Sequence, residues 1–526
     1  MKSGEDRRNS RSRSSGRNAK NTRSKNSRSR SDSKGRRRNN RDKRRDIDAE
    51  NGENIRKNKR ANPYIIMVTY AFVLLFLGMI AYLSYFMIFQ SKEKINNPYN
   101  TRYTILNKRI IKGSIKSADG KRLAYTKEDM DGNIERIYPY KNMYAHVVGR
   151  EKNTMTGIEK AYCYPLLTSD INPLTKLVND FKGVKNPGDN VITTLNHKLQ
   201  KVAYEALGNN RGAVVAIEPS TGKILAMVSK PDYDPNTVDK NWDSLVKADD
   251  DSSALLNRAT QGQYPPGSTF KVLTAIEYLI ENSSTYAEYN YNCKGTANFG
   301  EDADMKCYGS EVHGNVNLAK SLAESCNCSF ANIGLNIDMD RLVTLAERFG
   351  FNKGLMADYE YKSSKISVTS KSSTAEKIET AIGQGKTLVT PLQNAMVAAT
   401  IANKGVMMKP YLVDSIVNDN GTVVKQYKEK KNGKVISESV SEEIGQYMCQ
   451  VTDYGTARSL SSLPYKVAGK TGTAEYDSKG SSHAWFIGYA PYKNPKIAIS
   501  IVVESSGTGS QYAVPIAQSM FSAYIN

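Results

Sequence analysis

The sequence predicts a membrane-anchored protein of the α/β (α+β) class, with a single N-terminal transmembrane helix, a small β-rich domain and a larger mixed domain. Three observations lead to this prediction. An uncharged stretch runs from Tyr64 to Phe89, short strand patterns follow it, and after residue 187 strand patterns stand at both ends of a region rich in helical patterns. Strands that flank helices in this way favour one central sheet covered by helices.

The segment 1–60 forms a basic tail. It holds 23 Lys and Arg against 8 Asp and Glu, which gives +15 of the chain's net charge of +21, and almost no apolar residue precedes Ile47. Such a segment cannot bury enough surface to offset chain entropy, so it is predicted to be disordered. A basic tail can bind nucleic acid, but beside a membrane span a topology signal that contacts anionic lipid is favoured. No nucleic-acid partner is therefore expected.

The uncharged stretch is predicted to be an uncleaved anchor. As a helix it is about 39 Å long, enough to cross a hydrocarbon core of roughly 30 Å. The alternative is a cleaved signal peptide, but the run is too long and the following SKEKINN lacks a small-residue cleavage site. Because Lys and Arg concentrate before the span, the N-terminus is predicted to be cytoplasmic and the chain from Ser91 onward extracytoplasmic, on a single-pass protein of the cell membrane.

Local patterns divide the rest of the chain. Asn107 to Tyr125 reads as two strands around an Ala-Asp-Gly-Lys turn, and Gly212 to Pro231 reads as a hairpin. Leu318 to Gly334 and Thr390 to Asn403 read as helices. The predicted parts are a cytoplasmic tail (1–60), a transmembrane anchor (61–90), a small β-rich domain (91–187) and an α/β domain (188–526).

A first motif, Ser-x-x-Lys, begins at Ser268. It follows Pro-Pro-Gly and opens an apolar, helix-compatible run, so Ser268 is predicted at a helix N-terminus, with Lys271 on the same face. A partly desolvated lysine can take the proton of a serine hydroxyl and make it a nucleophile. The alternative is a serine cap with a solvated lysine, and the same spacing occurs twice more before residue 95.

A second motif, Ser-x-Asn, comprises Ser325 and Asn327 and follows the first along the chain. Asparagine offers a donor and an acceptor, and a serine hydroxyl can relay a proton. Alone this motif carries little weight, because Ser-Lys-Asn at 24–26 matches it too.

A third motif, Lys-Thr-Gly-Thr, begins at Lys470 on a predicted strand, with glycines on both sides of Lys470 and Thr471. Glycine in a strand marks a close approach by a ligand or another backbone. A peptide substrate could pair along such an edge and present its carboxylate to Lys470 and the threonine hydroxyls. The alternative is a β-bulge in an ordinary hairpin.

In this order, the three motifs resemble the signature of penicillin-binding proteins and serine β-lactamases. GAVVAIEPSTGKILAMVSKPDYDPN, GQGKTLVTPLQNAMVAATIANKG and HAWFIGYAP look like the transpeptidase domain of class B penicillin-binding proteins. NPYNTR, KGSIKSADGKRLA and GIEKAY look like the N-terminal pedestal domain of that class. The resemblance covers roughly residues 97–526 and implies the penicillin-binding transpeptidase/serine β-lactamase-like fold.

The resemblance also implies a role for each motif and a reaction. Ser268 would be acylated by a peptidoglycan stem peptide or a β-lactam and would need no cofactor. The expected partner is a SEDS-type glycan polymerase in the membrane. The implied roles are general base for Lys271, proton transfer and substrate-amide binding for Ser325 and Asn327, and carboxylate binding for Lys470, Thr471 and Thr473. Gly472 belongs to the same substrate-binding motif, and the N–H groups of Ser268 and Thr473 would form the oxyanion hole.

Four cysteines lie within 36 residues, from Cys293 to Cys328, together with His313. Cys293-x13-Cys307-x5-His313-x12-Cys326 supplies a Cys3His set, which is typical of structural zinc. The resemblance raises this expectation, because some rod-elongation members of the class carry a metal in this insertion. Cys328 competes for the fourth position. A Cys293–Cys307 disulfide, or free buried thiols, are the alternatives.

Three other functions compete with this interpretation. A bifunctional polymerase would need a further domain of roughly 150–200 residues, and residues 91–187 are too few for it. A β-lactamase shares the motifs but normally lacks the pedestal and the anchor. A β-lactam sensor normally has several spans or a cytoplasmic output domain, whereas the cytoplasmic part here is a tail.

Overall fold

The computed structural model describes residues 62–86 and 101–525, except 131–132, 249–252, 356, 358 and 476–481. The predicted tail (1–60) lies outside the described residues. The chain divides into two compact units, Met1–Met87 and Ile88–Asn526.

In the first unit, helix α2 spans Pro63–Tyr85. The Asn62 side chain accepts a hydrogen bond from Tyr64 N, and Pro63 occupies the first helical position, so the helix start is well defined. Among the described residues, α2 is the one helix long and apolar enough to cross a membrane. Its 23 residues extend about 35 Å, which matches a hydrocarbon core.

The second unit begins with a six-stranded sheet of order β15-β14-β6-β2-β3-β4, in which β2 pairs parallel to β6. The predicted turn joins β2 and β3, but the first predicted strand starts late because residues 101–109 form α4. Strands β6, β14 and β15 come from beyond residue 187, so distant segments complete this sheet. The domain boundary at residue 187 stays a prediction. The strands are β2 (Ile115–Lys116), β3 (Arg122–Glu128), β4 (Ile134–Ile137), β6 (Asn190–Thr193), β14 (Val413–Val417) and β15 (Val423–Gln426).

Short helices and a small parallel strand pair surround this sheet. They are α4 (Thr101–Arg109), η2 (Lys141–Tyr144), α5 (Gly157–Ala161), α6 (Cys163–Leu166), α7 (Pro173–Lys182), β1 (Ile110–Ile111) and β5 (Asn186–Pro187). A buried ion cluster binds these pieces together: Glu159 accepts from Arg136 Nε at 2.8 Å and pairs with Lys112 Nζ at 2.7 Å. Burial alone would raise the pKa of Glu159, but the two cations lower it to about 2.

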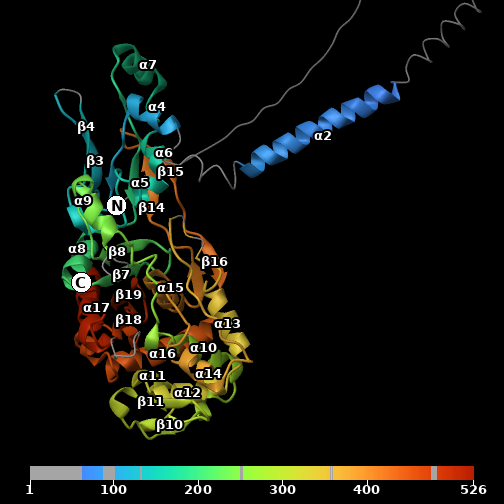
Figure 1. Ribbon diagram of the computed structural model, residues 1–526, viewed down its shortest axis with the longest axis vertical. Coiled ribbons are helices and arrows are strands. Elements are labelled where there is room, and N and C mark those ends of the chain that lie inside the picture. The colour runs from blue at the N-terminus through green and yellow to red at the C-terminus, as the bar shows by residue number, and fades with distance from the viewer. Residues whose placement is uncertain are drawn as a thin grey trace, which may run out of the picture. The chain divides into compact units, whose positions relative to one another are not determined.

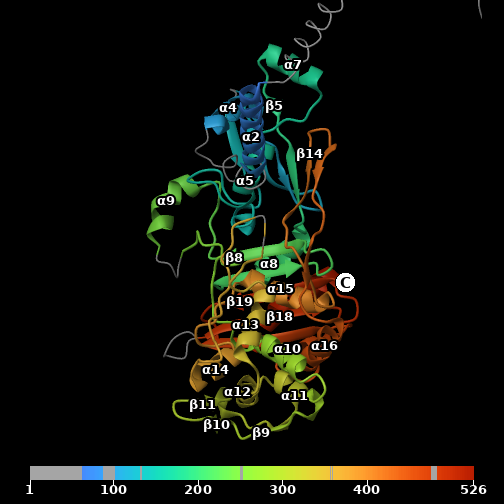
Figure 2. The same cartoon turned by 90° about the vertical axis from the view of Figure 1, so that its right-hand side faces the viewer.

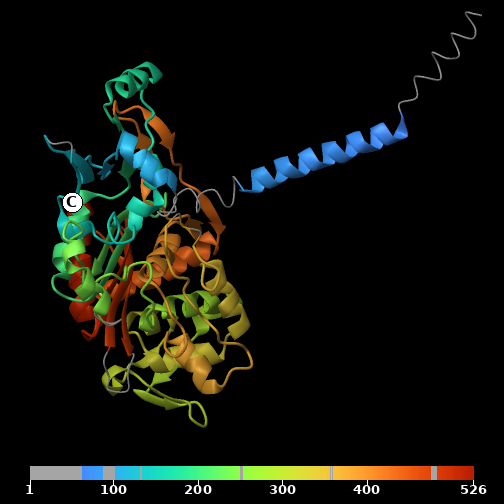
Figure 3. The same ribbon diagram turned by 45° about the horizontal axis from the view of Figure 1, so that its top comes forward.

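A second sheet has five antiparallel strands in the order β17-β18-β19-β7-β8. The predicted hairpin at Gly212–Pro231 is confirmed as β7 and β8. Helices α8 and α17 cover one face and α15 covers the other, which gives an α/β/α sandwich (Figures 1 and 3). The elements are β7 (Gly212–Ile217), β8 (Ile224–Lys230), β17 (Ala468–Glu475), β18 (Ser482–Ala490), β19 (Ile497–Val503), α8 (His197–Leu207), α15 (Pro391–Ala402) and α17 (Gly509–Ile525).

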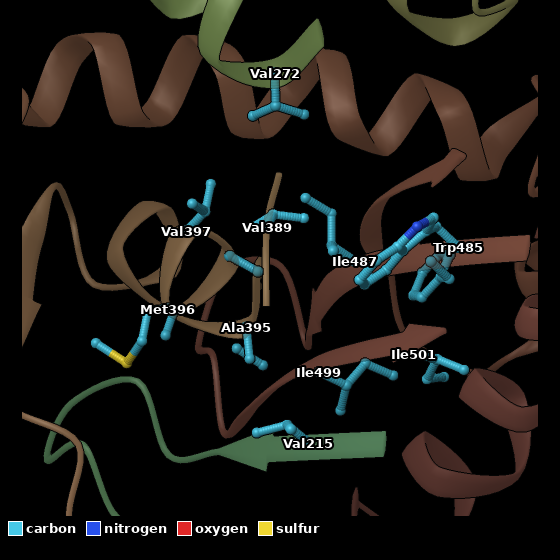
Figure 4. Close-up of a cluster of buried hydrophobic side chains, with 14 of the residues drawn as sticks. Val215, Val272, Val389, Ala395, Met396, Val397, Trp485, Ile487, Ile499 and Ile501 are labelled. Carbon is cyan, nitrogen blue, oxygen red and sulfur yellow. The ribbon is translucent and has the colours of Figure 1, made fainter. Parts of the chain in front are cut away.

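The core lies between α15 and this sheet. Every residue of α15, β18 and β19 is buried, and their sequences are mostly apolar without a regular alternation of apolar and polar residues. Figure 4 shows side chains from α15, the segment before it, the sheet and the start of α10 (Lys271–Glu281) meeting there, namely Val215, Val272, Val389, Ala395, Met396, Val397, Trp485, Ile487, Ile499 and Ile501.

Further helices and short strands make up the rest of the second unit, and most of them lie on the α15 side of the sandwich (Figure 2). The predicted helix at Leu318–Gly334 is wrong as one element, because Ser325 has a positive φ of 59° and Cys326 caps a new helix, so two helices form. The elements are α9 (Val238–Lys247), η3 (Gly267–Thr269), α10 (Lys271–Glu281), η4 (Tyr286–Glu288), β9 (Tyr291–Cys293), β10 (Thr296–Asn298), β11 (Asp304–Lys306), η5 (Tyr308–Ser310), β12 (Gly314–Val316), α11 (Leu318–Ala323), α12 (Asn327–Leu335), α13 (Met339–Arg348), α14 (Thr374–Ala381), β13 (Val406–Met408), β16 (Lys431–Lys434), α16 (Glu438–Asp453) and η6 (Arg458–Ser462).

Candidate active site

Ser268 lies in η3, the tight turn that leads into α10, and its side chain is half-buried. Two contacts fix this turn: Gly267 N donates to Gly383 O, after α14, at 2.9 Å, and Trp485 Nε1 of β18 donates to Pro265 O at 3.1 Å. Gly267 has a φ of 53°, and a Cβ there would lie 2.6 Å from Thr473 O. Only glycine allows this approach, and it brings the Ser268 turn into contact with β17.

The three predicted motifs meet around the Ser325 hydroxyl. Lys271 Nζ donates to Ser325 O at 2.7 Å and to Asn327 Oδ1 at 2.6 Å, and it lies 3.4 Å from Ser325 Oγ. Lys470 Nζ donates to the same Ser325 Oγ at 2.9 Å and to Thr471 O at 3.0 Å. A single hydroxyl therefore links two lysines from distant parts of the sequence.

Burial makes both lysines candidate bases. Each is fully buried, and neither forms an ion pair with a carboxylate in the part of the chain that the structure describes. Burial lowers the pKa of Lys271 to about 8. Burial, and then repulsion from Lys271, hold the pKa of Lys470 well below its ordinary value. Two ammonium groups so close together in a dry site favour the loss of one proton near neutral pH.

Strand β17 offers an open edge beside Ser268. It is the first strand of its sheet, and within the described residues no further strand pairs with it. Thr471 is buried, Gly472 packs against Thr269 and Trp485, and Thr473 is half-buried, so an extended peptide could reach only the outer part of this strand.

Two residues that contact β17, Thr456 and Gln384, were not predicted from the sequence to belong to the site. Thr456 Oγ1 lies 2.5 Å from Thr471 Oγ1, and Thr456 O accepts from Ser510 Oγ at 2.6 Å. In the orientation that satisfies both its groups, the Gln384 amide makes two 3.2 Å hydrogen bonds to the backbone of Glu475. Gln384 lies in the GQGK segment that carries the resemblance, whereas no local pattern distinguishes Thr456, because its contacts are set by tertiary structure.

The predicted Cys/His set forms a second cluster next to Ser325. One ligand atom from each of Cys293, Cys307, His313 and Cys326 lies within 4.8 Å of every other. Cys307 Sγ is 3.7 Å from the sulfurs of both Cys293 and Cys326, and Cys293 Sγ is 3.5 Å from His313 Nδ1. The three cysteines are free thiols, and their sulfur–sulfur distances are well beyond the roughly 2.05 Å of a disulfide bond. The Cys293–Cys307 disulfide therefore does not form in this structure.

Cys307 is the centre of this thiol cluster. Hydrogen bonding with Cys326 and Cys328 lowers the pKa of the Cys307 thiol, and Cys307 Sγ lies 3.6 Å from Cys328 Sγ. The hydrogen bond to Cys307 raises the pKa of His313 to about 9. Cys328, the expected competitor, also donates to Met305 O at 3.7 Å and therefore points partly away from the set.

The fold is an α/β/α sandwich, and its site combines a serine in the turn before a helix, two buried lysines and an open strand edge. This combination is the architecture of serine acyl-transfer enzymes that act on peptides. Comparison with known proteins makes the class specific. The family model of the penicillin binding protein transpeptidase domain matches residues 212–523.

Relatives match over most of the chain. The peptidoglycan D,D-transpeptidase PbpA of Mycolicibacterium smegmatis is 33% identical over 497 residues, 88% of this chain and 99% of the relative. The peptidoglycan D,D-transpeptidase MrdA of Escherichia coli is 28% identical over 72% of this chain and 70% of its own length. The ceftriaxone acyl-enzyme complex of penicillin-binding protein A from Mycobacterium tuberculosis matches with a TM-score of 0.73 and 31% identity, over 80% of this chain and 100% of that structure. The chain therefore belongs to the penicillin-binding protein transpeptidase family, and it has the fold that the motifs predict.

Proposed function

We propose that this chain is a peptidoglycan D,D-transpeptidase that works through an acyl-enzyme on Ser268. Neutral Lys271 takes the Ser268 proton as Oγ attacks the carbonyl carbon of the penultimate D-Ala of a stem peptide. The C–N bond breaks, the terminal D-Ala leaves with a proton relayed through Ser325, and Ser268 holds the acyl group as an ester. An amine of a neighbouring stem peptide then attacks this ester, forms the cross-link and restores the Ser268 hydroxyl.

The other motif residues bind the substrate in this proposal. Asn327 orients the peptide amide, and the N–H groups of Ser268 and Thr473 stabilise the oxyanion. The carboxylate of the donor peptide interacts with Lys470 and the hydroxyls of Thr471 and Thr473, and Gly472 lets this strand pack closely against Thr269 and Trp485. The observation that carries the proposal is the convergence of both lysines on Ser325 Oγ. The reaction needs no cofactor, and a β-lactam would acylate the same serine.

Labelling with a fluorescent penicillin tests this proposal. The full-length chain should form a long-lived adduct that Ser268→Ala abolishes, while Ser461→Ala, a change at an exposed serine in η6, leaves it intact. Release of D-Ala from a stem-peptide analogue then identifies the transpeptidase. Hydrolysis of the adduct within seconds would indicate a β-lactamase instead, and an adduct without any D-Ala release would indicate a sensor.

We also propose that Cys293, Cys307, His313 and Cys326 hold a structural zinc ion. A tetrahedron with Zn–S bonds of about 2.3 Å has S···S edges of about 3.75 Å, which agrees with the 3.7 Å between Cys307 and each of two partners. Zinc would stabilise the thiolates and join the β9–β12 insertion to the start of α12.

Metal analysis of the purified chain tests the zinc site. We expect about one zinc per chain, lost in Cys293→Ser and retained in Cys449→Ser, which changes a buried free cysteine of α16 outside this cluster. Zinc-free protein with normal stability would refute the proposal.

For localisation, we propose that α2 anchors the chain with its N-terminus in the cytoplasm and the second unit outside it, next to a SEDS-type glycan polymerase. The length of α2 and the basic tail support the topology, and the family supports the partner. Protease treatment of intact cells should remove the second unit and spare the tail, and the reverse result would overturn the topology.

A further inference from the structure

Helix α7 presents its apolar face away from the protein. Leu174, Leu177, Val178 and Phe181 recur at helical spacing and form one stripe, and none of them is buried. Leu174 is 73% exposed and Phe181 82%. In a soluble protein such a stripe normally packs against the core, so its exposure calls for an explanation.

The polar face of α7 makes the contacts with the protein. Asn179 Nδ2 donates to Asn186 Oδ1, and Asn186 Nδ2 donates to Asp180 Oδ1, both at 2.9 Å. Asn186 is buried in β5, so this pair of hydrogen bonds holds the helix by the side opposite to the apolar stripe.

The helix itself is well specified. The Asn172 side chain caps the N-terminus by accepting from Leu174 N at 2.9 Å, and Pro173 takes the first position. Gly183 ends the helix with a left-handed φ of 67°. The apolar stripe is therefore a formed surface held outward, not an incidental feature of an irregular loop.

The stripe lies at the end of the second unit where the chain arrives from the anchor. Strands β1 and β5 pair, α4 leads into β1, and α7 precedes β5 (Figures 1 and 2). Only the short segment 86–100 separates the end of α2 at Tyr85 from the start of α4 at Thr101. A segment of this length reaches at most about 50 Å, which limits how far the start of α4 can lie from the end of α2.

We propose that α7 inserts its apolar stripe into the outer interface of the membrane that anchors the chain. Lys176, Lys182 and Lys185 outnumber the one acidic residue of this segment, Asp180, so anionic headgroups are favoured. A stable protein interface takes about 20–30 residues from each side, whereas this stripe offers four. A lipid surface needs no larger patch, and the short tether makes insertion an intramolecular event at high effective concentration.

Tryptophan quenching in nanodiscs tests this proposal. The full-length chain carrying Phe181→Trp is placed, one copy per disc, in phosphatidylglycerol-containing bilayers with or without lipids brominated on the acyl chains. We expect bromolipid to quench Phe181→Trp at least about twice as strongly as Lys176→Trp, whose side chain projects from the opposite face. Co-purification with the disc reports anchoring by α2, and the penicillin adduct reports the proposed function, so each can fail independently.

Other occupants of the stripe give different results. Equal quenching of the two variants at the level of the unchanged chain would overturn the proposal. Shielding of Phe181→Trp from aqueous iodide without bromolipid quenching would also overturn it and would indicate a protein partner. Shielding that appears only when discs hold two copies would indicate self-association instead.

Discussion

The segment 325–328 has two sides with different chemistry. Ser325 and Asn327 bind the buried lysines, whereas Cys326 and Cys328, the alternate residues, lie among the thiols. Ser325 holds a positive φ of 59°, a conformation that costs a non-glycine residue of order 1 kcal/mol or more. Cys326 stabilises this bend by accepting a hydrogen bond from Ser329 N at the start of α12. The geometry of the lysine side therefore depends on the thiol side.

The comparison assigns different tasks to the two sides. The lysine side contains buried polar groups, and apolar side chains of similar size would stabilise the fold at least as well. The thiol side joins the β9–β12 insertion to α12 and also lies against β11, where Cys328 Sγ donates to Met305 O at 3.7 Å. Substitutions on the lysine side should reduce reactivity without loss of stability, and those on the thiol side should reduce both.

The largest effect is expected for Lys271→Met. This change removes the proposed base and keeps the length of the side chain, so the rate of acylation by a β-lactam should fall about 10³-fold. Because an apolar chain replaces a buried cation, Tm should hold or rise. Stopped-flow acylation and calorimetry measure the two quantities. A rate within tenfold of the unchanged chain would show that another group takes the Ser268 proton.

The matching change on the thiol side is Cys307→Ser. Cys307 lies within 3.7 Å of the sulfurs of Cys293, Cys326 and Cys328, so its loss should lower Tm and remove the proposed metal. Acylation should fall about 10–100-fold, the range seen when the support of a site is disturbed. Cys449→Ser is the control. If Cys307→Ser left Tm unchanged and slowed acylation as much as Lys271→Met, the division between the two sides would be wrong.

The pH dependence of acylation sharpens the role of the lysine side. With its pKa lowered to about 8 by burial, Lys271 is mostly protonated at pH 7 and mostly neutral at pH 9. Only the neutral amine can accept a proton, so the rate should rise about tenfold over this interval and then level off. The profile is measured with correction for spontaneous β-lactam hydrolysis. A flat profile would mean that Lys271 is already neutral at pH 7 or is not the base.

The sequence predicts what is local and misses what distant segments share. The anchor helix, the β7–β8 hairpin, α15 and the strand of Lys470 all follow from patterns within a short window. The completion of the six-stranded sheet by β14 and β15 depends on the pairing of β14 with β6, a strand far earlier in the chain, which no local period encodes.

The same limit applies to the candidate site. The break at Ser325 is invisible in the apolar period of Leu318–Gly334, because contacts with the lysines and thiols, not propensity, decide it. The three motifs name the groups that meet at Ser325, but only the tertiary structure reveals that Thr456 and Gln384 contact β17.

The smallest expected effect tests a residue that acts on the lysine side from a distance. Thr456 contacts Thr471, not the proposed position of the reacting atoms, so it is a positioning residue. Thr456→Val keeps the shape and removes one hydrogen bond worth about 1 kcal/mol, which corresponds to a roughly fivefold slower acylation. Thr456→Ser retains the hydroxyl and should restore the rate. Because Thr471 is proposed to bind the substrate carboxylate, the loss should fall on a β-lactam with its carboxylate intact and largely vanish for the methyl ester. Equal slowing of acid and ester would instead mean that Thr456 supports β17 as a whole.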